Sequence, residues 1–99
     1  MFVVSVMYPA GGEIDMDYYR DRHLLLVQER WGGMGLRDVR VLRGVAAPPG
    51  GEIAFQLIAL LEFDSAEDFM AAAGAHGAEI MGDVANFTSL TPIVQFNDG

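Results

Sequence analysis

IAFQLIALLEF, Ile53–Phe63, is the stretch that constrains the fold most strongly. Side chains of a strand alternate between the two faces of its sheet. One face of this stretch is wholly apolar and carries Ile53, Phe55, Leu57, Ala59, Leu61 and Phe63. The other face carries Ala54, Ile58 and Leu60, interrupted by Gln56 and Glu62. A strand that is apolar on both faces is covered on both faces, so we predict that it lies at the centre of a sheet.

A second strand of the same kind and an edge strand complete the pattern. Phe2–Tyr8 is apolar on both faces, with Ser5 as its only polar residue, and is predicted as the other central strand. Leu36–Val45 alternates charged residues with valine and leucine, as an edge strand does. Thr88–Phe96 is predicted as the last strand.

Two helices are predicted between these strands. The first begins at Asp15, a good N-cap, and runs to Trp31. The second begins in FDSAEDFMAAA with Asp64 or Ser65 as its cap, and a short continuation over Ala75–Val84 follows Gly74. The order is βαββαβ, which predicts an α+β, ferredoxin-like domain with a four-stranded antiparallel sheet over residues 1–99.

The two-faced strands also predict a homodimer. Helices cover only one face of such a sheet, and monomers avoid leaving a large apolar face in water. A second copy packed sheet against sheet covers it. The alternative is a monomer whose loops cover the face, but a chain of 99 residues has few loops for that.

Composition narrows the function classes. The net charge is −8, lysine is absent, and all six arginines lie between Arg20 and Arg43, so no nucleic-acid-binding surface is expected. The absence of cysteine removes disulfides and thiolate chemistry, and fits a cytoplasmic protein. The N-terminal residues lack a basic leader, and no apolar run is long enough to cross a membrane.

The first helix carries the candidate site. At 3.6 residues per turn, its buried stripe contains Met16, Tyr19, His23 and Val27, with Leu24, Leu26 and Trp31 beside it. His23 is either a core histidine bonded to a tyrosine or carbonyl, or a base that faces a pocket with Tyr19 as a donor to an oxyanion. Tyr18 and Leu25 are predicted to face outward, as a contact patch or as scattered exposed side chains.

Other chemistries have little support. His76 and Glu79 have a spacing that suits a metal, but two ligands are too few. No serine lies in a glycine-flanked elbow, and no glycine-rich loop has the pattern of a phosphate site. We therefore expect no metal and no cofactor. Arg20 and Arg30 can bind a carboxylate, but ion pairs with Asp17 or Glu29 are favoured.

The chain resembles the EthD family of the dimeric α/β-barrel proteins over nearly its whole length. The resemblance is carried by Tyr8-Pro9, IDMDYYRDRHLLLV from Ile14, EFDS at Glu62–Ser65, and GDVANFTSLTPIVQ from Gly82. The family pattern usually has proline two residues after the histidine, where this chain has Leu25. The resemblance implies a barrel-forming homodimer and a cleft between helices and sheet that holds a small, often aromatic, ligand.

Three hypotheses of function follow. The first is a dimer that binds a hydrophobic aromatic or lactone-like molecule, with His23 and Tyr19 catalytic and Tyr8, Tyr18, Val27, Trp31 and Asn86 binding the ligand. Its chemistry would be a cofactor-free monooxygenase or an isomerase or cyclase, in catabolism or secondary metabolism. The second is a non-enzymatic carrier for a partner oxygenase, which the resemblance places in a cytochrome P450-type ether-degradation system. Haem handling through His76 or His23 is a third hypothesis.

Overall fold

The computed structural model describes residues 1–99 and has the predicted ferredoxin-like fold. Its elements are β1 (Phe2–Pro9), α1 (Met16–Tyr18), η1 (Tyr19–His23), α2 (Leu24–Trp31), β2 (Leu36–Arg43), β3 (Phe55–Phe63), α3 (Ala66–Asp83), η2 (Val84–Asn86) and β4 (Ile93–Asp98). The strands form one antiparallel sheet in the order β2-β3-β1-β4. The prediction that the two-faced strands are central is confirmed, and β2 is an edge strand as expected.

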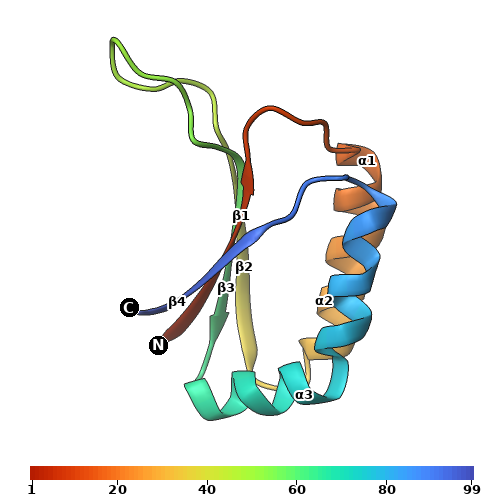
Figure 1. The fold of residues 1–99 in the computed structure, drawn as a ribbon. Coiled ribbons are helices and arrows are strands. Elements are labelled where there is room, and N and C mark those ends of the chain that lie inside the picture. The colour runs from red at the N-terminus through yellow and green to blue at the C-terminus, as the bar shows by residue number, and fades with distance from the viewer.

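The helices cover one face of this sheet and leave the other open (Figure 1). On the covered face, β3 buries Leu57, Ala59, Leu61 and Phe63, and β1 buries Val4 and Tyr8. The pairing of Val4 with Leu61 aligns the two strands so that their covered side chains form one layer. The 44–54 segment between β2 and β3 projects beyond the end of the sheet (Figure 1).

The second helix and its predicted continuation over Ala75–Val84 form one continuous element, α3, which ends at Asp83. Helix α3 begins at its cap Ser65, whose hydroxyl accepts a hydrogen bond from Asp68 N–H at 3.1 Å, and runs through Gly74 to Asp83. One glycine in a helix costs about 1 kcal/mol. Burial of Phe69, Ala72 and Ile80 on the same helix outweighs that cost.

The last strand begins at Ile93, later than the predicted Thr88. Thr88 forms only an isolated bridge with Ile14, and its hydroxyl donates to the carbonyl of Glu13 at 2.7 Å. Pro92 precedes β4 and has no N–H to donate to a strand ladder. These contacts hold the segment against the start of the first helix rather than in the sheet.

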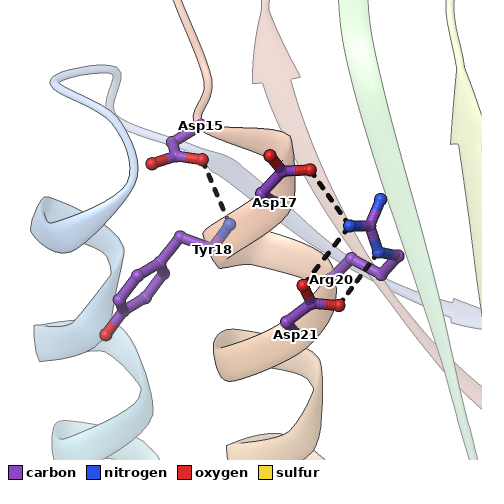
Figure 2. Close-up of polar contacts among 5 residues, drawn as sticks. All are labelled: Asp15, Asp17, Tyr18, Arg20 and Asp21. Atoms are coloured by element: carbon purple, nitrogen blue, oxygen red, sulfur yellow. Dashed lines mark hydrogen bonds and ion pairs between the residues drawn. The ribbon is translucent and has the colours of Figure 1, made fainter.

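The first helix begins as predicted but contains a wide turn. Asp15 caps it by accepting a hydrogen bond from Tyr18 N–H at 3.1 Å (Figure 2). The next turn, η1, is a π-helix in which Leu24 N–H donates to the carbonyl of Tyr19, five residues back. Wide turns of this kind occur often at functional sites. Here the turn spans the two residues that the sequence singles out for chemistry, Tyr19 and His23.

None of the helices in the structure has the length and apolar character needed to cross a membrane.

Candidate functional site

An apolar cavity of about 250 Å³ lies between the sheet and the helices. Seventeen of its 19 lining residues are hydrophobic. Its floor is formed by β1 and β3, and its walls by α2 and α3. Its rim includes three exposed side chains, Met81, Val94 and Phe96. Apolar cavities with a few polar groups are the usual sites of small-molecule binding.

Five of the residues that the sequence points to line this cavity: His23, Tyr19, Tyr8, Val27 and Trp31. All five are buried, the two tyrosines with only 1% of their surface exposed and His23 with 5%. The indole N–H of Trp31 donates to the carbonyl of Ala72 at 2.8 Å, so Trp31 has no free donor for a ligand. The polar groups left on the cavity wall are therefore His23 and the two tyrosines.

Asp83, at the end of α3, holds the imidazole of His23. Its Oδ2 lies 2.9 Å from Nδ1 of His23, and both side chains are largely buried. Because a carboxylate only accepts hydrogen bonds, Nδ1 carries the proton and donates. The other ring nitrogen, Nε2, makes no hydrogen bond within the protein and is left with a lone pair. This is the arrangement of a general base held by an acidic partner.

Tyr18 does not face outward as predicted, whereas Leu25 does, with 53% of its surface exposed. The Tyr18 hydroxyl donates to Oδ1 of Asp83 at 2.6 Å, and its ring stacks on Phe87. In a regular α-helix, positions 18 and 23 point about 140° apart. The wide turn rotates Tyr18 toward the side of His23 and α3, and Figure 2 shows its side chain extending toward that helix.

Asn86 completes the set of groups around Asp83. Its amide donates to Oδ1 of Asp83 at 2.9 Å and to the Tyr18 hydroxyl at 3.3 Å. Neither Tyr18 nor Asn86 lines the cavity. These two residues, predicted as ligand contacts, instead bind the carboxylate that holds His23.

The hydrogen bonds keep Asp83 ionised. Partial burial alone would raise the pKa of Asp83, but the bonds from Tyr18, Asn86 and His23 together lower it below its ordinary value of 3.8. The same bond to Asp83 raises the pKa of the Tyr18 hydroxyl, which therefore remains a donor. An ionised Asp83 fixes the imidazole tautomer and would stabilise a protonated His23.

Sequence reasoning missed Asp83 and Phe87. The ring centroid of Phe87 lies 4.7 Å from that of His23 and 5.2 Å from that of Tyr19, so it packs against the aromatic side of the site. The sequence does contain an indication of the role of Asp83: it is an acidic residue at a helix C-terminus, where the partial negative charge of the helix disfavours one. An aspartate in that place needs donors from elsewhere in the fold.

The remaining polar candidates are engaged on the surface. Glu79 binds Arg30 through two hydrogen bonds of 2.8 and 3.1 Å, while His76 lies 3.9 Å from it. Arg20 pairs with Asp17, as predicted, and with Asp21, on the side of the helix away from Tyr18 (Figure 2). No group of three or more histidine, aspartate or glutamate side chains is placed to hold a metal ion.

Comparison with solved structures identifies relatives of this fold. An EthD-like protein from Ralstonia eutropha JMP134 is 40% identical, with 98% of this chain and 89% of that chain covered and a TM-score of 0.87. An ethyl tert-butyl ether (EthD) family protein from Bacillus halodurans C-125 is 23% identical, with 100% and 99% covered and a TM-score of 0.67. A dimeric ferredoxin-like protein from an uncultured marine organism is 15% identical, with 99% and 95% covered and a TM-score of 0.58.

No protein-family model matches the chain, and no curated protein matches it. The two more distant structures show the shared fold. The Ralstonia protein shows more, because its identity of 40% extends over nearly the whole of both chains. The chain belongs to the EthD family.

Proposed function

We propose that this protein binds a hydrophobic small molecule in the cavity and that His23 removes a proton from it. The observation that carries this proposal is the 2.9 Å contact between Nδ1 of His23 and Asp83, which leaves Nε2 free on an apolar wall. A base in a site shielded from water acts on a bound carbon acid without competition from solvent.

The proton transfer is a balanced step. The C–H bond of the ligand breaks, its proton moves to Nε2 of His23, and its electron pair stays on the ligand as a carbanion or enolate. Asp83 stabilises the imidazolium that forms. Two later fates suit the proposal: reaction of the carbanion with dioxygen in a monooxygenase, or return of the proton to another carbon in an isomerase or cyclase.

Hydrogen–deuterium exchange tests the step without knowledge of the natural reaction. An enolisable aromatic ketone, 2-tetralone, and an enolisable lactone are incubated in D₂O with wild-type protein or with His23→Ala, and deuterium at the acidic carbon is followed by NMR. We expect wild type to accelerate exchange of at least one probe by more than tenfold over buffer, and His23→Ala to lose that acceleration while still binding the probe.

The same experiment separates the enzyme from the carrier. A carrier for a partner oxygenase would bind the probes, as seen by thermal shift, without accelerating exchange. Acceleration that survives in His23→Ala would assign the chemistry to another residue. The absence of binding by every probe would remove the cavity as a ligand site for this class.

We also propose a homodimer formed through the open face of the sheet. That face carries half-buried apolar side chains on the central strands, and Leu42 and Ile93 beside them are 42% and 51% exposed. The marine ferredoxin-like protein of the same fold is described as dimeric. A second copy packed on this face would remove the apolar side chains from water.

Sedimentation analysis of two matched variants tests the dimer. Leu60→Glu places a charge at the centre of the open face, whereas Leu25→Glu places one on the exposed side of α2. We expect a dimeric wild type, a dimeric Leu25→Glu and a monomeric Leu60→Glu. A monomeric wild type at micromolar concentration would contradict the proposal.

A further inference from the structure

Two buried tyrosine hydroxyls on the cavity wall have no partner in the protein. Tyr8 and Tyr19 are each only 1% exposed, and their ring centroids lie 6.1 Å apart with the rings nearly perpendicular. Neither hydroxyl makes a hydrogen bond with another group of the chain. Every side-chain nitrogen or oxygen that is fully enclosed in the structure does have a hydrogen-bond partner. The two oxygens must therefore be accessible, and the space that both side chains line is the cavity.

Unpaired hydroxyls are unusual in such a place. Buried polar groups are nearly always hydrogen-bonded, because an unpaired group loses its contact with water without replacement. The Trp31 indole and the Tyr18 hydroxyl follow this rule, each with a partner at 2.8 Å or less. The two unpaired hydroxyls lie on the same cavity as Nε2 of His23, which also has no partner in the protein, and this suggests that a ligand supplies their partners.

Both hydroxyls remain protonated donors. Burial raises the pKa of Tyr19 to about 12. Burial and the neighbouring phenol of Tyr19 raise the pKa of Tyr8 as well. At neutral pH the cavity thus presents two O–H donors beside the lone pair of His23.

The cavity has no positive charge to receive an anion. No arginine lines it, and Arg20, Arg30 and Arg37 pair with carboxylates on the surface. The nearest charged group behind His23 is the carboxylate of Asp83. A ligand carboxylate would enter an apolar space beside a negative charge, which is costly.

We propose that Tyr8 and Tyr19 donate hydrogen bonds to one oxygen of an uncharged ligand, so that the ligand class is a neutral aromatic ketone or phenol rather than a carboxylic acid. This inference rests on the proposed function of His23. When His23 removes a proton from the carbon next to a ketone, the C–H electron pair moves onto the ketone oxygen; when it removes the O–H proton of a phenol, the electron pair stays on the phenol oxygen. In both cases the proton goes to Nε2, and the two tyrosine hydroxyls stabilise the resulting oxyanion. A ligand oxygen also gives the hydroxyls the partner that they lack.

Three probes of similar shape test the proposal: naphthalene, 2-naphthol and 2-naphthoate. Their affinities are measured by calorimetry for wild type, Tyr8→Phe and Tyr19→Phe, with circular dichroism to verify folding. Each variant removes one oxygen and leaves the ring. We expect wild type to bind 2-naphthol at least tenfold more tightly than naphthalene, and to bind 2-naphthoate more weakly than either.

Each phenylalanine variant should bind 2-naphthol about fivefold more weakly and bind naphthalene within twofold of wild type. Because 2-naphthol has a single oxygen, loss in both variants places both hydroxyls on that oxygen. Equal binding of naphthalene and 2-naphthol, or tightest binding of 2-naphthoate, would overturn the inference and leave the cavity as a ligand site. Failure of all three probes to bind would overturn the inference together with the proposed function.

Discussion

Replacement of Asp83 by asparagine should reverse the imidazole tautomer of His23. In the wild type, Oδ1 of Asp83 accepts from Tyr18 at 2.6 Å and from Asn86 at 2.9 Å, whereas Oδ2 faces only Nδ1 of His23. An asparagine amide has one oxygen and one NH₂ group. Its oxygen belongs on the side with two donors, so its NH₂ must face Nδ1. Nδ1 then has to accept, and the proton moves to Nε2.

The expected size of the effect follows from the hydrogen bond. A hydrogen bond to a charged group contributes about 1.5–3 kcal/mol. The Asp83 side chain is only 13% exposed, so solvent screening removes little of this. In the wild type the Nδ1–H tautomer should exceed the other by about 10- to 100-fold. In Asp83→Asn a neutral hydrogen bond should favour Nε2–H by about fivefold.

The variant should fold but be less stable. It loses the charge on three hydrogen bonds, those with Tyr18, Asn86 and His23, and regains part of that free energy because an anion is removed from a helix C-terminus. We expect a net loss of about 1 kcal/mol, or about 4–8 °C in Tm for a domain of this size. Proton abstraction should fall by at least about fivefold, because Nε2–H cannot accept a proton and only the minor tautomer leaves Nε2 free. Loss of the carboxylate that stabilises the imidazolium should lower it further.

Nitrogen-15 NMR of the histidine rings measures the tautomer directly. The chain has two histidines, and the partly exposed His76, in contact with neither Asp83 nor the cavity, provides an internal reference. In the neutral form of the ring, the wild-type His23 signals should be those of protonated Nδ1 and unprotonated Nε2, and in Asp83→Asn the pattern should be exchanged. The same tautomer in both proteins, with the fold intact, would refute the role given to Asp83.

Three further predictions concern stability and space. Since the pKa of Asp83 is lowered in the folded state, its contribution to stability is complete above pH 3.8 and is lost as pH falls through the lowered pKa. The difference in unfolding free energy between wild type and Asp83→Asn, measured by urea titration, should therefore shrink below pH 3.8. A constant difference down to about pH 2 would contradict this. Tyr18→Phe should lower the unfolding free energy through loss of the 2.6 Å hydrogen bond to Asp83. An unchanged free energy of unfolding in urea titration would mean that the bond is not formed in solution. Gly77→Ala and Gly74→Ala should each stabilise α3 by about 0.5–1 kcal/mol, because the new methyl group meets only Ala73 at 3.7 Å in the first and nothing within 4 Å in the second. Only Gly77 lines the cavity, so only Gly77→Ala should weaken 2-naphthol binding; equal affinities would place the ligand elsewhere.

The fold was predictable because its decisive signals are local and periodic. Alternation in Phe2–Tyr8 and Ile53–Phe63 identified the central strands. The cap Asp15 predicted the start of the first helix, and Ser65, one of the two predicted caps, precedes the second. The start of the last strand was wrong because contacts across the fold override a local rule. Thr88 contacts Ile14 and Glu13 instead of pairing within the sheet.

The site was predictable in part, for a related reason. Tyr19 and His23 lie one turn apart in either kind of helix, so their common face did not depend on helix type. Tyr18 depended on it, because only the wide turn rotates position 18 toward Asp83. The partnership of His23 with Asp83 joins residues 60 positions apart in the chain. Periodicity within one segment contains no information on such a pairing.

The size of the cavity and the small residues on its wall indicate that the sequence keeps room for a ligand. Filling a cavity of about 250 Å³ with packed side chains would stabilise the fold by up to about 6 kcal/mol at ~24 cal/mol per Å³, an upper bound because the rim opens to solvent. That is comparable with the whole stability of a small domain, about 5–15 kcal/mol. Small residues on the cavity wall, Ala59, Ala73 and Gly77, maintain the space, and Gly77 would accept a methyl group with only ordinary contacts. Selection for stability alone would fill such positions, so their small size favours a binding function.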